Sequence, residues 1–140
     1  MKVGEIMTKD VAFATPSMTL RQAAQVMKEL NVGALPVRDK PNGLLGIVTD
    51  RDITCRAVAG GLNPATATVK EVMSGNIEYC TEDEDVKDAV QQMEKRQIRR
   101  MPVRGKNNQI VGMLATADIS RHAPHELAGE LMESVSQARA

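Results

Sequence analysis

The stretch GIVTDRD, residues 46–52, returns 66 residues later as GMLATAD, residues 112–118. The glycine and the aspartate keep their places, and an apolar pair follows each glycine. Thr49 of the first copy has no counterpart, because Ala115 stands in its place. The repetition predicts a duplicated structural unit. The lost threonine predicts that the two copies differ in what they can bind.

The duplication extends over most of the chain. Residues 3–57 align without a gap on residues 69–123, and about sixteen of these positions are identical, among them the PVR of 36–38 and of 102–104. The two aromatic residues of the chain, Phe13 and Tyr79, also coincide. We therefore predict a first half-domain over residues 1–62, a linker over 63–68, a second half-domain over 69–124 and a helical tail over 125–140.

Each half is predicted to be β-α-β-β-α, which makes the fold class α+β. The segments at 10–15 and 76–81 are short and extended, and amphipathic helices follow them, opened by Thr19 with Gln22 as a capping box and by Asp85 as a cap. Two strands follow in each half, and the proline in the first of them predicts an edge or a bulge. A second helix begins at Asp50 or Thr116. One half is too small for a good core, so the two halves should pack together.

The tail carries a weak helical stripe. Leu127, Leu131 and Val135 are spaced i, i+4, i+8, whereas Gly129 between them costs roughly 1 kcal/mol relative to alanine. A helix packed on the body of the protein or on a second subunit is expected.

Net charge, cysteine count and the length of apolar runs disfavour several classes of protein. The formal net charge is zero, which disfavours a nucleic-acid binder. The two cysteines form no disulfide framework, which favours a reducing cytoplasm. Apolar runs are too short to span a bilayer, and no secretory segment follows Met1.

Two interpretations of residues 49–52 remain open. Thr49 and Asp52 form a capping box at a strand-to-helix turn, so the pattern can be purely structural, with Thr116 as the cap in the second copy. The same turn also suits a nucleoside phosphate. Helix amides favour a phosphate, the Asp52 carboxylate can accept two ribose hydroxyls, and neighbouring apolar residues can hold a base.

With its duplicated ALPV…GIVTDRD and RMPV…GMLATAD motifs, the chain resembles a cystathionine β-synthase (CBS) domain pair, or Bateman module, over residues 3 to about 123. The resemblance implies two halves that pack through their sheets about a pseudo-twofold axis. It also implies that clefts between them bind AMP, ADP, ATP, NAD or S-adenosylmethionine. Thr49 and Asp52 match the ribose-binding positions of the family. Asp118 matches in the second half, but Ala115 departs from the motif.

The resemblance also suggests where the base and phosphate lie. The base-binding candidates of the first half are Phe13, Thr15, Ala34, Leu35 and Pro36, and those of the second are Tyr79 and Met101. Strand aromatics can equally be core or subunit contacts. Arg99 and Arg100 can cross the cleft to a phosphate held over Thr49 and Asp52, or they can form a solvated helix end, where cations are favoured.

No catalytic set is visible, and a metal site is not expected, because His122 and His125 lack further ligands at known spacing. Cys55 is expected to be buried on a helix face. The sequence therefore predicts a regulatory module that binds an adenosine-containing nucleotide, needs no cofactor, is no enzyme and forms a homodimer through its helix faces. The alternative is a ligand-free scaffold that regulates an unidentified partner protein.

Overall fold

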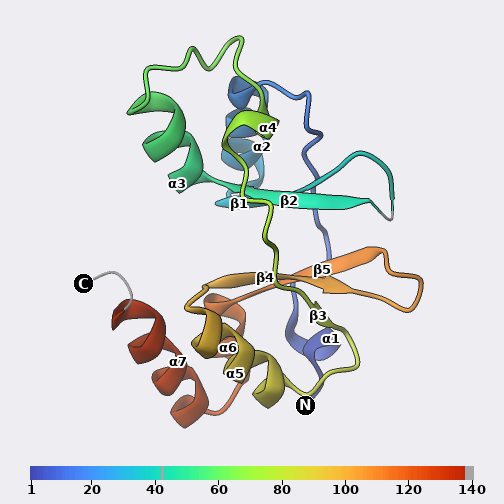
Figure 1. The fold of residues 1–140 in the computed structure, drawn as a ribbon. Helices are drawn as coiled ribbons and strands as arrows, with labels where there is room; N and C mark the ends of the chain where they lie inside the picture. The colour runs from blue at the N-terminus through green and yellow to red at the C-terminus, as the bar shows by residue number, and fades with distance from the viewer. Residues whose placement is uncertain (42, 138–140) are drawn as a thin grey trace. The chain divides into compact units, whose positions relative to one another are not determined.

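The computed structural model describes residues 1–41 and 43–137, and the chain divides into two compact units. The first-repeat unit is Ala12–Ile77, and the second-repeat unit combines Met1–Val11 with Glu78–Ala140. Each unit contains a small sheet with helices packed on one face (Figure 1). The predicted α+β class with two tandem half-domains is confirmed.

The first-repeat unit is built around the antiparallel pair β1–β2. Its elements are α2 (Leu20–Leu30), β1 (Ala34–Arg38), β2 (Leu44–Thr49), α3 (Asp50–Asp52), the π-helix η1 (Ile53–Val58) and α4 (Val69–Val72). Of the strand expected at residues 10–15, only a single bridge forms, between Ala14 and Val37.

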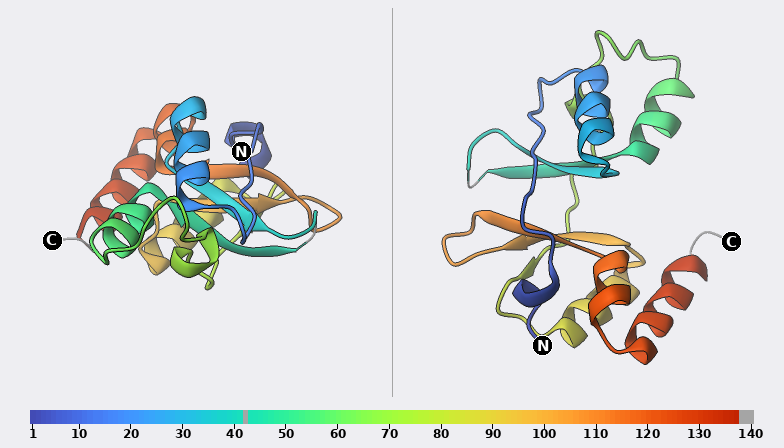
Figure 2. Two further views of the ribbon diagram at one scale, coloured as in Figure 1. Left: turned by 90° about the horizontal axis from the view of Figure 1, so that it is seen from above. Right: turned by 180° about the vertical axis from the view of Figure 1, so that it is seen from behind.

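The second-repeat unit has a three-stranded sheet in the order β3-β4-β5. Its elements are α1 (Val3–Ile6), β3 (Cys80–Thr81), α5 (Val86–Arg96), β4 (Arg100–Arg104), β5 (Ile110–Ala115), α6 (Thr116–His122) and α7 (His125–Gln137). Helices α5, α6 and α7 lie together on one face of the sheet (Figure 2).

The long helices begin and end as their local sequences dictate. Thr19 Oγ1 accepts from Gln22 N at 3.2 Å, and Gln22 Oε1 accepts from Thr19 N at 3.0 Å, which confirms the capping box of α2. Asp85 caps α5 by accepting from Lys87 N. Both helices end at a residue in the left-handed region, Asn31 and Gln97. These matching ends give the two repeats the same turn into β1 and β4.

The prolines of β1 and β4 lie in an edge strand and in a central strand, respectively. β1 is one of the two strands of its sheet and has only the single bridge to Ala14 on its other side, so the edge prediction is confirmed for Pro36. β4 lies between β3 and β5, so the edge alternative is wrong for Pro102. A register shift does follow one residue after each proline, between Val37 and Arg38 and between Val103 and Arg104. Pro36 O accepts from Ala14 N, so its missing N–H faces that short bridge and leaves the pairing with β2 intact.

Each unit has its own apolar core. The first-repeat core gathers on α2, β1, β2 and α4, and the second-repeat core on α5, β4, β5, α6 and α7. Leu131 and Val135 of α7 are fully buried in the second core, which confirms the helical stripe of the tail. Residues 138–140 of the expected tail lie outside the described residues.

The short helix at the start of each repeat packs in the unit of the other repeat. α1 belongs to the second-repeat unit, where Val3 and Ile6 join the core, and α4 supplies Val69 and Val72 to the first-repeat core. The residues after these helices add a bridge to each sheet, Thr8 with Met113 and Ser74 with Ile47. The compact units therefore differ from the sequence repeats at their amino-terminal ends.

Cys55 is exposed, so the expectation that it is buried is wrong. It lies in η1, and a π-helix has a wider turn than an α-helix. The α-helical spacing used to predict a buried Cys55 therefore does not apply to this segment. In η1 the buried residue is Ala57.

Candidate functional site

The candidate site is the turn between β2 and α3, which Thr49 and Asp52 close by reciprocal hydrogen bonds. Asp52 N donates to Thr49 Oγ1 at 3.1 Å, and Thr49 N donates to Asp52 Oδ2 at 3.0 Å. The structural interpretation of this pair as a capping box is therefore confirmed.

The capping box leaves part of each side chain available. The Asp52 side chain is 13% exposed, and within the described part of the chain its Oδ1 has only a long ion pair, 3.8 Å from Arg56 Nε. The Thr49 hydroxyl donates to no acceptor among residues 1–41 and 43–137. An ionised carboxylate has about four acceptor positions and a hydroxyl has one donor, so both groups retain hydrogen-bonding capacity toward a ligand.

Arg56 is a site residue that the sequence interpretation left on the helix surface. Its Nη1 also donates to Val72 O at 3.2 Å, which fixes the guanidinium beside Asp52. The i, i+4 spacing of the two residues could have indicated the pair.

The backbone amides of this turn are not open to a phosphate. Asp50 N donates to Gly33 O, Arg51 N donates to the Asp50 side chain, and Asp52 N donates to Thr49. The expectation of unpaired amides here is wrong, because the Gly33 carbonyl, the Asp50 carboxylate and the Thr49 hydroxyl accept from them. A phosphate at this turn would therefore need side-chain cations.

One face of the first-repeat sheet brings several candidates to the turn. Ala34 lies directly opposite Thr49, and Pro36 lies opposite Ile47. Leu35 faces the other way and is buried in the core with Val48. The β-strand alternation therefore places Ala34 and Pro36, but not the Leu35 side chain, on the face that carries Thr49.

The two aromatic candidates are each covered by an arginine. The guanidinium of Arg38 lies 3.4 Å from the centre of the Phe13 ring, and that of Arg104 lies 3.9 Å from the centre of the Tyr79 ring. These cation–π contacts occupy one face of each ring. A base could stack only on the opposite face.

In the second repeat the carboxylate of Asp118 is buried and held by two hydrogen bonds. Asp118 Oδ2 accepts from Ala115 N at 2.8 Å, and Oδ1 accepts from the Thr8 hydroxyl at 3.2 Å. Asp118 is only 6% exposed. The cap of α6 is Ala115, so the expectation that Thr116 caps this helix is wrong. No local pattern points to Thr8, which is 110 residues away in sequence.

The remaining second-repeat candidates lie on β4 and just before it. Arg100 pairs with Ala115 across β4 and β5, where Ala34 and Thr49 pair in the first repeat. Met101 is buried in the core, as its counterpart Leu35 is. Arg99 O accepts from Thr116 N, which ties the start of β4 to α6.

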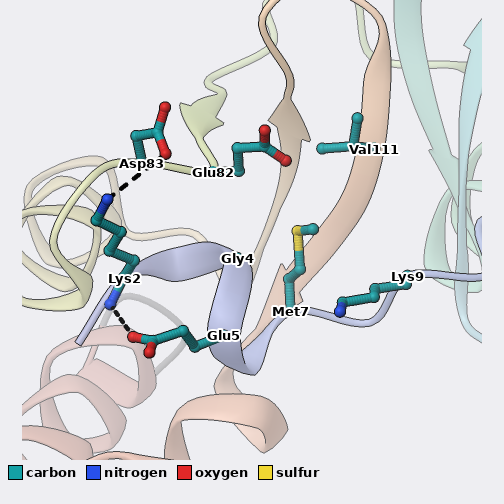
Figure 3. Close-up of a pocket in the computed structure, with 8 residues that line it drawn as sticks. All are labelled: Lys2, Gly4, Glu5, Met7, Lys9, Glu82, Asp83 and Val111. Atoms are coloured by element: carbon teal, nitrogen blue, oxygen red, sulfur yellow. Dashed lines mark hydrogen bonds and ion pairs between the residues drawn. The ribbon is translucent and has the colours of Figure 1, made fainter.

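Each unit has a cavity on its described surface. The second-repeat cavity, about 480 Å³, lies between α1, β5 and the segment after β3 (Figure 3). Its Lys2 is paired with Asp83 at 3.8 Å and, through its backbone, with Glu5 at 2.6 Å. The first-repeat cavity, about 420 Å³, runs along α2 and includes the candidate Thr15. Neither cavity is lined by Thr49 or Asp52.

Catalytic and metal-binding groups are sparse. Within residues 1–41 and 43–137, no three or more His, Cys, Asp or Glu side chains gather in a way that could hold a metal ion. Burial raises the pKa of the Cys80 thiol to about 12, so this residue stays protonated at neutral pH. None of the described helices has the length and apolar character needed to cross a membrane.

Comparison with known proteins places these features in a family. The family model of the CBS domain matches residues 3–57 and 69–125. Hypoxic response protein 1 of Mycobacterium tuberculosis is 35% identical over 131 residues, covering 94% of this chain and 91% of that protein. The CBS domain-containing protein YhcV of Bacillus subtilis is 38% identical over 135 residues, covering 96% of this chain and 94% of that protein.

Solved structures show the same architecture. The crystal structure of Hypoxic Response Protein I, which holds two coordinated zinc ions, has a TM-score of 0.78 and 38% identity, covering 89% of this chain and 100% of that one. The CBS domain pair of protein MJ0100, in complex with 5′-methylthioadenosine and S-adenosyl-L-methionine, has a TM-score of 0.76 and 30% identity. It covers 86% of this chain and 94% of that one.

Proposed function

Because the chain belongs to the CBS-domain family, we propose that it is a regulatory module that binds an adenosine-containing compound. The ligand binds at the turn between β2 and α3 of the first repeat, with Thr49 and Asp52 as its ribose contacts. Binding is transmitted to a partner through a change in conformation or in self-association. The module carries out no reaction of its own.

The observation that supports this proposal most directly is the state of the Asp52 carboxylate. Oδ2 is fixed by Thr49 N, whereas the one interaction of Oδ1 with a described residue is the Arg56 ion pair at 3.8 Å, and the side chain is 13% exposed. A carboxylate in a fixed orientation with a spare oxygen can accept the hydroxyls of a ribose. The free hydroxyl hydrogen of Thr49 adds a donor beside it.

The relatives point to the class of ligand. Protein MJ0100 was solved with two adenosyl compounds, and its CBS pair spans most of the present chain. These compounds share an adenine and a ribose, and they carry no phosphate. The blocked amides of the turn fit such a ligand, and a nucleotide would instead place its phosphate on arginines.

We propose the following contacts for the remainder of the ligand. Ala34 and Pro36 form an apolar wall for the base on the face that carries Thr49, and Thr15 and Phe13 border it. Arg56, whose Nε lies 3.8 Å from Asp52 Oδ1, is the proposed cation for a phosphate. In the second repeat, Tyr79, Arg100, Met101 and Asp118 align with Phe13, Ala34, Leu35 and Asp52, and Arg99 aligns with Gly33.

A thermal-shift panel with AMP, ADP, ATP, NAD and S-adenosylmethionine tests the proposal. A ligand at about 100 times its Kd stabilises the folded protein by roughly 2.7 kcal/mol, which raises Tm by several degrees in a domain of this size. Asp52→Ala should abolish the shift. Asp85→Ala is the matched control, because it also removes a capping carboxylate at a cost of about 1 kcal/mol but should keep the shift.

The alternative function is a ligand-free scaffold that forms dimers and regulates a partner protein. It is favoured if none of the five compounds changes Tm at millimolar concentration. Light scattering with and without ligand then separates the two signalling routes. If the module works through self-association, the ligand changes the average mass that light scattering measures. A ligand has this effect only when it binds the two association states with different affinities.

A further inference from the structure

The hydroxyl of Thr8 occupies one oxygen of the Asp118 carboxylate. It donates to Asp118 Oδ1 at 3.2 Å, while Ala115 N donates to Oδ2 at 2.8 Å. Oδ2 is thus engaged as in Asp52, by the amide of the residue three positions earlier. The two carboxylates differ at Oδ1.

In the first-repeat unit the position equivalent to Thr8 is Ser74, which comes from the second copy of the sequence. Ser74 is bridged to Ile47 as Thr8 is to Met113, so the backbone places the two hydroxyl residues alike. Among the described residues, however, Ser74 makes no hydrogen bond to Asp52, whose Oδ1 faces Arg56 instead. The β-branched side chain of threonine has few allowed rotamers, which favours a fixed hydroxyl over a mobile one.

The chain around Thr8 is held too firmly to withdraw easily. Thr8 N donates to Met113 O and Met113 N donates to Thr8 O, both at 2.9 Å. A Cβ on Gly112 would lie 2.8 Å from Thr8 O, so the absence of a side chain there lets the segment lie directly on β5. Asp118 is therefore covered by a part of the folded unit itself.

We propose that Thr8 acts as an internal substitute for a ribose hydroxyl and closes the second repeat to nucleosides. The chain then binds one adenosine compound, through the first repeat alone. Two features act together. Ala115 lacks the threonine hydroxyl that would contact a ligand, and Thr8 occupies the Asp118 carboxylate, which is the remaining ribose contact. This inference rests on the proposed function for its ligand, but the shielding of Asp118 by Thr8 can be measured without any ligand.

Carboxyl labelling with a carbodiimide and an amine, read by mass spectrometry, tests the shielding. In the native protein Asp118 should be modified about tenfold more slowly than Asp52 because its hydrogen bonds must first open. Thr8→Ala should bring Asp118 close to the rate of Asp52. Thr8→Ser keeps the hydroxyl and should preserve the protection. Equal labelling of Asp52 and Asp118 in the native protein, or unchanged protection in a folded Thr8→Ala variant, overturns the proposal.

Titration calorimetry with S-adenosylmethionine and with AMP tests the effect on binding. The native protein should bind one ligand per chain, and Thr8→Ala combined with Ala115→Thr should bind two. Thr8→Ser with Ala115→Thr is the control and should bind one. Two ligands in the native protein, reduced to one by Asp118→Asn, overturn the proposal, as does a single ligand in the Thr8→Ala double variant. If no protein binds either compound and none of the five compounds of the thermal-shift panel changes Tm, the proposed function fails, and the labelling rates alone decide whether Thr8 shields Asp118.

Discussion

Single residues of the repeated motif have identifiable physical reasons. Gly46 lies where the chain after α4 crosses β2, and a Cβ there would come within 2.5 Å of Ser74 O. The aspartate of each copy fixes the amide at the end of the preceding strand. The glycine and the aspartate therefore recur because both units need them to fold, whereas Thr49 is free to differ in the other repeat.

The close approach at Gly46 predicts a large effect of a single methyl group. Gly46→Ala should destabilise the protein by about 1–3 kcal/mol, because the nearest atom is backbone and cannot move without breaking the Ser74–Ile47 bridge. Gly75→Ala is the matched control, since no atom lies within 4 Å of a Cβ at that position. Urea denaturation of both variants measures the difference, and equal stabilities would contradict the crossing.

Helix α7 shows how an element completes a core. It packs on α5 and α6, and Gln97 Nε2 at the end of α5 donates to Ser134 Oγ at 2.9 Å. Leu131 lies at the centre of the buried stripe. Gly129 weakens the helix on its own, so most of its stability must come from this packing.

The packing of α7 predicts a clear contrast between neighbouring residues. Leu131→Ala should destabilise the second-repeat unit by about 2–5 kcal/mol, since it leaves a cavity in the core. Met132→Ala, on the exposed side of the same helix, should change stability by less than about 0.5 kcal/mol. Thermal unfolding followed by circular dichroism compares them, and similar losses in both variants would mean that α7 does not pack as described.

Elements with local signals were predictable, and contacts between distant residues were not. Thr19, Gln22 and Asp85 define their helix starts within four residues, so their caps could be read from the sequence. The strand at 10–15 shrinks to one bridge, because only Ala14 of that segment pairs with β1. The Thr8–Asp118 bond, and the cap at Ala115 in place of Thr116, depend on a chain crossing that no local pattern encodes.

For the whole molecule, the boundaries of the compact units differ from those of the sequence repeats by one short helix and the residues after it. Each unit takes its short amino-terminal helix from the start of the other repeat. Val69 and Val72 of α4 are buried in the first-repeat core, and Val3 and Ile6 of α1 are buried in the second. Neither repeat can therefore complete its core from its own residues.

This exchange predicts different behaviour for two fragments of equal length. Residues 12–77 contain every element of the first-repeat unit, whereas residues 1–66 contain α1 but lack α4 and Ser74. The fragment 12–77 should show more helix by circular dichroism and slower amide exchange than 1–66, although a unit of this size has only marginal stability. Adding residues 67–77 to the fragment 1–66 should restore the protection of the β2 amides, because Ile47 N and Ser74 N then regain their partners. If 1–66 is as well protected as 12–77, α4 is not part of the first-repeat core.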